Sequence, residues 1–424
     1  MNPDANRYSL ADFYFSDTEN PLTPPADFLA WRRDTAWATS LYESRIGGAA
    51  EAVCILEQEA GPKAVINMAA NDYLGLVKHP KILAAAMEAL QLYGMGSCGS
   101  PLLFGKTVPH YELEQRLSKL TGREAVLLFS SGFGGALGSI AGLLRKGDVA
   151  IADEHAHLSM LDGAKLAGAK IVFFAHNDAD SLNEALAAHQ GKRRLVIVEG
   201  IYSMDGDMVN LPRLLEVTEA HGVEIFIDEA HSILCCGAGG GGVVEQFGVQ
   251  SRIGVQYATF SKGFSSCGGF TAASRDIVEY LRFYARPYGF SVAPPPATTA
   301  GLCRALDVMN EEKWRREKLW ANAEYFKAQL QSIGIDTGKS TSYIVPIMVG
   351  DDRALLYELG HALRKRGLFV APVDYPAVPL DQVRFRARVT ATHTREHIDQ
   401  ALQILQDVFV PAMRAKGLLS GRQV

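Results

Sequence analysis

The sequence predicts an α/β protein with a large, mostly parallel sheet and helices on both faces, followed by a smaller α+β C-terminal domain. From Pro80 onward, short and nearly continuous apolar runs alternate with helical stretches. Such runs are typical of parallel strands buried on both faces of a sheet. The alternation stops after Pro294-Pro295-Pro296, where a long helical stretch begins. A chain of 424 residues is long enough for two or three domains.

Three segments are predicted along the chain. Residues 1–75 form an N-terminal arm, a helix and small strands, residues 76–296 the large domain, and residues 297–424 the small domain. Helical spacing runs from Phe28 to Ile46, and the turn signal Gly61-Pro62 joins two strand-like runs. Strands are predicted at 52–57, 64–68, 124–129, 149–152, 170–174, 195–199, 224–227, 256–260, 343–349, 368–370 and 382–389. Further helices are predicted at 80–94, 111–120, 132–144, 297–333, 355–365 and 395–410.

The composition is that of an ordinary globular protein. Hydrophobic residues make up 48% of the chain and charged residues 21%, and the formal net charge is -5. This balance gives no reason to expect binding to nucleic acid or to a membrane. No apolar run approaches the ~20 residues that a spanning helix needs. The N-terminal residues lack a secretory pattern, so the predicted location is cytoplasmic.

Several polar or small residues follow directly after predicted strands. In parallel sheets, ligands bind at the carboxyl ends of the strands, so these side chains are expected to converge. The residues in question are Gly132, Ser203, Asp228 and Lys262.

Lys262 and Asp228 together favour a pyridoxal 5'-phosphate (PLP) enzyme. Lys262 lies in the small-residue loop Thr259-Phe260-Ser261-Lys262-Gly263, and Asp228 ends an apolar run. A lysine amine forms a Schiff base with the cofactor's aldehyde, and a carboxylate keeps the pyridine nitrogen protonated so that the ring accepts electrons. A lone loop lysine would be an ordinary surface charge, so the hypothesis depends on its surroundings.

Weaker signals surround this pair. The run Ser130–Gly135 follows a strand and opens a helix, which suits a phosphate but also a simple tight turn. His231 is placed to hydrogen-bond the cofactor's phenolic oxygen, although Asp228 could equally cap a helix. The string Asp228-Glu229-Ala230-His231 also occurs in helicases, but the chain lacks their phosphate loop.

His155 and His157 raise the alternative of a metal site. No third ligand is evident, and none of the six cysteines lies at zinc-ligand spacing to a histidine pair. A role for His157 in stacking on the ring of a cofactor is therefore preferred, and no metal is predicted.

Taken together, these motifs resemble the α-oxoamine synthase family of fold-type I PLP-dependent transferases. That family includes 8-amino-7-oxononanoate synthase, 2-amino-3-ketobutyrate CoA ligase, 5-aminolevulinate synthase and serine palmitoyltransferase. The resemblance runs in family order from about residue 65 to residue 394. The matching segments are Asn71–Leu76, Gly105–His110 with Leu113-Glu114, Ser131–Phe133, His157–Ser159, Glu199–Asp207, Asp228–Ser232, Thr259–Gly263, and Arg386 before Thr390–Thr394.

The resemblance implies a role for each candidate site residue and makes the large domain the PLP-binding domain. Lys262 carries the cofactor and removes the Cα proton of the substrate, and an Arg386 guanidinium grips the amino-acid carboxylate. Asn71 is a second candidate near that carboxylate. The remaining implied contacts are Asp228 with the pyridine nitrogen, His157 over the ring, Ser203 and His231 with the phenolic oxygen, and Thr259 with the backbone of Gly132 and Phe133 around the phosphate.

The implied reaction is a decarboxylative Claisen-type condensation. A small amino acid and an acyl thioester, carried by CoA or a carrier protein, would give an α-amino ketone, carbon dioxide and a free thiol. The family builds its sites at the interface of a homodimer. The chain departs from the family pattern at Pro101, Val292 and Ala293. An aminotransferase or aldolase of the same fold, or a non-catalytic partner subunit, are the alternatives.

Overall fold

The computed structural model describes residues 9–13, 19–57 and 61–419. By contacts, the chain forms two compact units. The first unit comprises the described residues up to 70 together with 204–206 and 318–419, and the second unit comprises residues 71–203 and 207–317. The domain boundaries at residues 75 and 296 stay a prediction.

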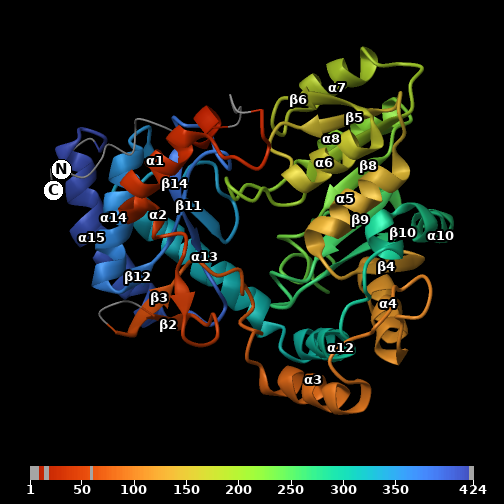
Figure 1. Ribbon diagram of the computed structural model, residues 1–424, viewed down its shortest axis with the longest axis horizontal. Helices are drawn as coiled ribbons and strands as arrows, with labels where there is room; N and C mark the ends of the chain where they lie inside the picture. Colours follow the sequence, from red (N-terminus) through yellow and green to blue (C-terminus); the bar gives the residue numbers. More distant parts are fainter. Residues whose placement is uncertain (1–8, 14–18, 58–60, 420–424) are drawn as a thin grey trace. The chain divides into compact units, whose positions relative to one another are not determined.

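The second unit is built on a seven-stranded sheet (Figure 1). One strand, β10, runs antiparallel to both of its neighbours, whereas the pairs from β9 to β6 are parallel. The predicted mostly parallel sheet is therefore confirmed, with β10 as an antiparallel insertion that the sequence did not predict. The strand order is β4 (Ala125–Phe129), β10 (Gly269–Ala273), β9 (Val255–Thr259), β8 (Ile225–Asp228), β7 (Arg194–Glu199), β5 (Val149–Asp153) and β6 (Lys170–Phe174).

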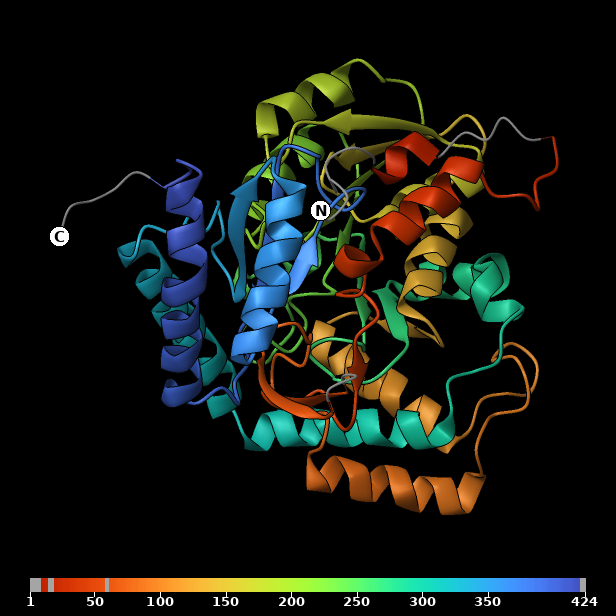
Figure 2. The ribbon, with the colours of Figure 1, turned by 60° about the vertical axis from the view of Figure 1, so that its left-hand side comes forward.

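The central strands owe their position to their composition. Every residue of β5, β8, β9 and β10 is buried. Strands that are apolar on both faces need cover on both faces, and Figures 1 and 2 show helices on both sides of this sheet. Two of the buried strands nevertheless end on an acid, Asp153 and Asp228.

One layer of helices packs closely on the sheet. Helices α5 (Gly132–Leu143), α6 (Leu158–Ala167) and α10 (Arg275–Tyr284) contribute to a single apolar core with the strands. A Cβ at Gly163 of α6 would lie 2.7 Å from the backbone oxygen of Leu137 in α5. Glycine at this position therefore lets α5 and α6 approach each other.

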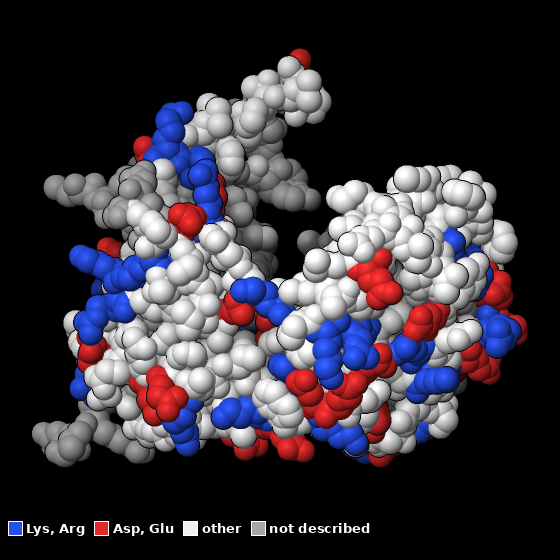
Figure 3. Space-filling view, turned by 90° about the horizontal axis from the view of Figure 1, so that it is seen from below, with Lys and Arg blue, Asp and Glu red and all other residues white. Residues whose placement is uncertain are grey.

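The remaining helices of the second unit complete its surface. Acidic and basic side chains on α3, α4 and α12 pair with each other, including Arg116 with Glu112 and Asp307. Figure 3 shows both signs of charge interleaved on the face that it draws. The helices are α3 (Pro80–Tyr93), α4 (Val108–Thr121), α7 (Ala179–Ala187), α8 (Leu211–Ala220), α9 (Val243–Gln246), α11 (Arg286–Gly289) and α12 (Pro296–Glu311).

The first unit contains two small sheets. Their strand orders are β1-β2-β3-β12 and β11-β14-β13. The predicted strand near residue 368 is β12, which pairs in parallel with β3. The strands are β1 (Arg45–Ile46), β2 (Val53–Glu57), β3 (Lys63–Asn67), β11 (Ile344–Gly350), β12 (Leu368–Phe369), β13 (Ala371–Val373) and β14 (Val383–Arg388). The helices are α1 (Ala26–Asp34), α2 (Ala36–Thr39), α14 (Arg353–Arg366) and α15 (Arg395–Ala415), with a short 3-10 helix at Leu10–Phe13.

Two predicted helices were too long. The helix predicted over residues 28–46 is broken at Thr35, whose hydroxyl donates to the Trp31 carbonyl at 2.8 Å and whose backbone leaves helical geometry. The helix predicted over residues 297–333 divides into α12 and α13 (Trp314–Ser332), because Glu312 adopts φ -116° and ψ 55°. Among the described residues, no helix is long and apolar enough to cross a membrane.

Candidate active site

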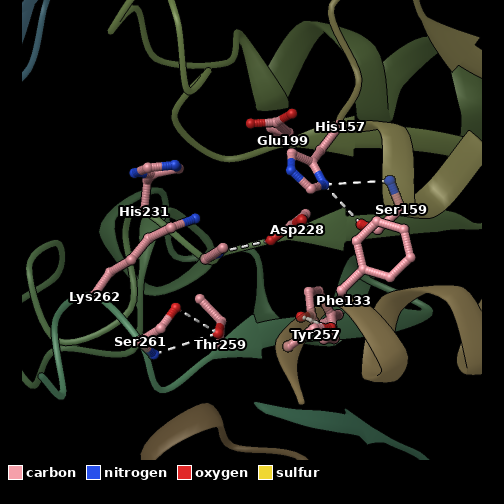
Figure 4. Close-up of a pocket in the computed structure, with 12 residues that line it drawn as sticks. Phe133, His157, Ser159, Glu199, Asp228, His231, Tyr257, Thr259, Ser261 and Lys262 are labelled. Carbon is pink, nitrogen blue, oxygen red and sulfur yellow. Dashed lines mark hydrogen bonds between the residues drawn. The ribbon is translucent and has the colours of Figure 1, made fainter. Parts of the chain in front are cut away.

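A cavity of about 220 Å³ opens in the second unit where β7, β8 and β9 end and where α5 and α6 begin (Figure 4). The structure thus brings together most of the side chains that the sequence singled out. The lining residues are Gly132, Phe133, His157, Ser159, Glu199, Asp228, Ala230, His231, Tyr257, Thr259, Ser261 and Lys262.

A tight loop after β9 presents Lys262 to this cavity. The backbone N–H of Ser265 donates to the Lys262 carbonyl at 2.9 Å, and Ser265 adopts a left-handed conformation with φ 54°. A Cβ at Gly263 would lie 2.6 Å from the Ile233 carbonyl, so this position requires glycine. The backbone of the loop is therefore closely packed, and Lys262 is partly buried and lines the cavity.

Asp228 lies at the buried end of β8, with 5% of its surface exposed. Its Oδ1 accepts the Ala230 N–H at 2.7 Å. Burial raises the pKa of Asp228, while the charges of Lys262 and His157 lower it. A carboxylate in this position gains stability from a cation, which is what a protonated ring nitrogen would supply.

Glu199 is a second buried acid in the cavity, and sequence reasoning assigned it no role. It is the register partner of Asp228 on the neighbouring strand. Among the described residues, its Oε1 is buried and has no hydrogen-bond partner. Burial and the charge of Asp228 raise the pKa of Glu199 well above its usual value, while Lys262 opposes them. The signal available in the sequence was an acid at a strand end, one strand away from Asp228.

His157 is held in place as the N-cap of α6. Its Nδ1 accepts the Ser159 N–H at 3.3 Å and lies 2.7 Å from the Ser159 hydroxyl. The Phe133 ring meets the imidazole edge-on, with centroids 6.5 Å apart. Figure 4 shows both rings at the margin of the cavity. These contacts fix an aromatic wall against which a flat ligand can stack.

The first turn of α5, which carries Phe133, also lines the cavity beside the end of β9. A Cβ at Gly132 would lie 2.4 Å from Thr259 Oγ1, so only glycine lets the helix start this close to the end of β9. Ser131 caps the helix by accepting the Gly134 N–H, and the Tyr257 hydroxyl donates to the Gly132 carbonyl at 2.5 Å. Tyr257 was missed by the sequence analysis. A helix N-terminus is a favourable place for a phosphate.

Three predicted site residues do not line this cavity in the described chain. Ser203 is buried in the loop after β7, and its N–H donates to the Glu199 carboxyl group. Asn71 belongs to the second unit, and its backbone oxygen accepts the Tyr73 N–H at 2.8 Å. Arg386 lies on β14 of the first unit and is buried, and its contact with an amino-acid carboxylate stays a prediction.

The cavity residues fit PLP. Glu199 keeps a buried oxygen without a partner, Asp228 is a buried carboxylate near a lysine, and the close approach of Gly132 to Thr259 leaves a helix N-terminus open to a phosphate. Lys262 would bind the cofactor's aldehyde, Asp228 its ring nitrogen, and the N-terminal turn of α5 its phosphate.

The metal alternative finds no support in the geometry. His155 stacks on His176 with centroids 4.0 Å apart, whereas His157 lines the cavity. Within residues 9–13, 19–57 and 61–419, no group of three or more His, Cys, Asp or Glu residues could hold a metal ion.

Comparisons with known proteins show the family to which the chain belongs. Residues 63–405 match the family described as aminotransferase class I and II. The chain is 37% identical over 376 residues to an 8-amino-7-oxononanoate synthase of Thermoanaerobacter pseudethanolicus, covering 87% of this chain and 95% of the relative. It is 38% identical over 351 residues to a serine palmitoyltransferase of Sphingobacterium spiritivorum, covering 82% and 88%.

A solved structure is similar to this chain as well. A serine palmitoyltransferase of S. paucimobilis with bound PLP and myriocin has a TM-score of 0.87 and 30% sequence identity. The match covers 93% of this chain and 98% of that chain, which confirms the predicted fold-type I PLP-dependent transferase fold. The chain belongs to the aminotransferase class I and II family, and it is a PLP-dependent enzyme of the α-oxoamine synthase type.

Proposed function

We propose that the enzyme condenses a small amino acid with an acyl thioester, releasing carbon dioxide and a free thiol and leaving an α-amino ketone. The observation that carries this proposal is the cavity that joins Lys262, Asp228 and His157. The named relatives, an 8-amino-7-oxononanoate synthase and a serine palmitoyltransferase, support the same class of reaction.

The side chains of the cavity have distinct tasks in this reaction. When bound, PLP supplies a sink for the negative charge that develops at Cα of the amino acid. Asp228 stabilises positive charge at the ring nitrogen, and Lys262 accepts the Cα proton and later returns it. His157 would stack on the face of the ring and hold it in place.

Binding of the amino-acid carboxylate is assigned to Arg386, with Asn71 as a second candidate. A guanidinium forms two parallel hydrogen bonds with a carboxylate, which suits a substrate whose carboxyl group must be oriented before it is lost. Arg386 is 6% exposed. Its Nη1 lies 3.5 Å from Met204 Sδ.

The test is a substrate screen with the PLP-loaded enzyme. Glycine, alanine and serine are each combined with acyl-CoAs of graded chain length and with an acyl carrier protein, and thiol and carbon dioxide are measured together. Equal amounts of both products from one pair, and none with the Lys262→Ala variant, are the expected result. Conversion of the cofactor to its amine form by an amino acid alone would instead identify an aminotransferase.

Cleavage of a hydroxylated amino acid without thioester would identify an aldolase. A protein that binds PLP but turns over none of these pairs would be a non-catalytic partner subunit. Either result would contradict the condensation.

We also propose that the enzyme is a homodimer. Large apolar side chains are exposed on the second unit, among them Met95 (82%), Leu103 (84%), Phe104 (81%) and Phe290 (90%). Exposed apolar surface of this kind usually marks an interaction site. Light scattering should give twice the 46.0 kDa chain mass, and the double variant Leu103→Lys, Phe104→Lys should be monomeric. A wild-type monomer would exclude the dimer.

A further inference from the structure

A short segment at the start of the second unit lies directly behind the active site. Tyr73 is fully buried there, and its hydroxyl lies 2.7 Å from Nδ1 of His231. The two rings are inclined by 51° with centroids 6.0 Å apart, so the contact is made through the hydroxyl rather than by stacking. His231 in turn lines the cavity that holds Lys262 (Figure 4).

The segment that carries Tyr73 is firmly held. The guanidinium of Arg315 donates to the Leu74 carbonyl at 2.8 Å. The Asp72 carboxylate accepts the Leu76 N–H at 2.8 Å and the hydroxyl of Ser265 in the lysine loop. The same few residues thus brace both the loop of Lys262 and the ring of His231, which leaves Tyr73 little freedom to turn away.

The direction of the Tyr73 hydrogen bond follows from the donor and acceptor strengths of the two groups. A neutral imidazole has one protonated nitrogen and one acceptor nitrogen, and the partner of one nitrogen decides which is which. A phenol O–H is a stronger acid than an imidazole N–H, and the unprotonated imidazole nitrogen is a stronger base than a phenol oxygen. Across the 2.7 Å contact, Tyr73 therefore donates its proton to His231 Nδ1.

We propose that Tyr73 is a positioning residue that fixes the tautomer of His231, with the proton on Nε2. In this state the imidazole presents a donor at Nε2, on the side of the ring opposite Tyr73. The phenolic oxygen of PLP is an acceptor, and a donor at Nε2 of this cavity-lining ring would suit it. This functional role rests on the function proposed above, whereas the tautomer itself is a property of the chain alone.

The first test needs neither cofactor nor substrate. Nitrogen NMR of PLP-free protein labelled at the histidine ring nitrogens distinguishes a protonated Nε2 from a protonated Nδ1. Loss of signals in the His231→Gln variant identifies those of His231. A neutral ring protonated at Nε2 is the expected result, and a ring protonated at Nδ1 would overturn the proposal without any variant of Tyr73 being required.

The second test compares Tyr73→Phe with Tyr357→Phe. Tyr357 is a matched control, because it is 4% exposed, its hydroxyl donates to Asp374 at 2.8 Å, and it lies in the first unit. Tyr73→Phe should produce a mixture of His231 tautomers, move the visible absorbance band of the PLP-loaded enzyme, and lower kcat about 10- to 100-fold, the usual loss when a group that orients a ligating side chain is removed. Tyr357→Phe should change none of the three.

The outcomes separate the two proposals. An unchanged tautomer in Tyr73→Phe, or a changed tautomer with an unchanged absorbance band, would overturn the role of Tyr73. If the wild type shows the Nε2 tautomer and the band of Tyr73→Phe moves, while no pair of substrates reacts, the role of Tyr73 stands and the proposed condensation fails.

Discussion

Asp153 and Glu199 are buried acids at the carboxyl ends of neighbouring strands, β5 and β7, yet their surroundings differ completely. The Asp153 carboxylate accepts four hydrogen bonds, from the N–H groups of His155 and Asn177, the His176 ring and the Tyr202 hydroxyl, all at 2.8–2.9 Å. Glu199 accepts the Ser203 N–H, and its Oε1 has no partner among the described residues.

The pKa values of the two acids follow this difference. Burial raises the pKa of Asp153, but the hydrogen bond and charge of His176, together with the N–H groups of His155 and Asn177, outweigh burial and lower the pKa. Burial raises the pKa of Glu199 and the neighbouring charge of Asp228 adds to it. Burial at a strand end is thus common to both acids. Unused hydrogen-bonding capacity beside Lys262 distinguishes a site for a ligand from a structural ion pair.

The largest effect is expected on activity, from a substitution in the cavity. Lys262→Ala should abolish product formation, by about 10⁴-fold or more, because it removes both the amine that binds the cofactor and the base. Borohydride should fix PLP covalently to the wild type and not to the variant, which mass spectrometry of the Lys262 peptide reports.

The control for this variant is Lys165→Ala on α6, whose exposed side chain pairs with Asp162. It should keep full activity. Residual turnover by Lys262→Ala within about 100-fold of the wild type would show that another group is the base, since general acid–base catalysis contributes 10²–10⁴-fold.

The next largest effect is expected for the cluster of Asp153, His176 and Asp207, where a substitution should lower the stability of the fold. Asp153→Asn should lower the free energy of unfolding by about 3–5 kcal/mol, because it leaves the buried charge of His176 with one partner fewer. Denaturant titration measures this loss. The control is Glu219→Gln, which removes an exposed acid paired with Arg252 and should change stability far less. Equal effects of the two variants would mean that the His176 network does not support the fold.

The sequence predicts the residues around the cavity only in part. Lys262 and Asp228 were found because each follows an apolar run, and parallel strands end at the same edge of a sheet. Glu199 also ends such a run. Its pairing with Asp228 depends on the register of β7 and β8, which a single sequence does not contain. Tyr73 and Tyr257 were missed for the same reason, since their partners lie 158 and 125 residues away.

Other features of the fold that the sequence did not predict have local causes. Strand β10, Gly269–Ala273, consists of small residues with one phenylalanine and one threonine, so it lacks the run of bulky apolar residues that marked the other strands. The break at Thr35 results from a side chain that competes for a backbone carbonyl within a helical pattern. Periodicity predicts which faces are buried, whereas β10 lacks a clear apolar pattern and the break at Thr35 depends on a single hydrogen bond.

His176 makes the structural cluster sensitive to pH. Burial lowers the pKa of His176, but hydrogen bonds with Asp153 and Asp207 raise it from 6.5 to about 10. Its contribution to stability is therefore complete below about pH 6.5. It declines by about 1.4 kcal/mol per pH unit as the unfolded chain alone loses the proton, and it is gone above about pH 10.

This dependence can be measured by comparing the wild type with His176→Gln. The difference between their free energies of unfolding should shrink by about 2–3 kcal/mol between pH 7 and pH 9. His221→Gln is the control, because its imidazole bonds to Asn183 at the surface. Parallel curves for the wild type and His176→Gln would exclude a shifted pKa in the folded state.

At about pH 5 the smallest effect is expected for Glu199→Gln, and the pH dependence of this variant would sharpen the comparison most. With its pKa raised, the folded state keeps a proton on Glu199 at a pH where the unfolded chain has lost it, so the stability of the wild type falls as pH rises above about 4.5. Glutamine has nearly the shape of the protonated acid and no charge. At about pH 5 the variant should therefore unfold with a free energy within about 1 kcal/mol of the wild type. It should also lack the decline of up to about 1.4 kcal/mol per pH unit that the wild type shows at higher pH. If the free energy of unfolding changes with pH equally in the wild type and in Glu199→Gln, then Glu199 is ionised in the folded state, as Asp153 is. In that case Glu199 Oε1 would have a partner in solution without any ligand.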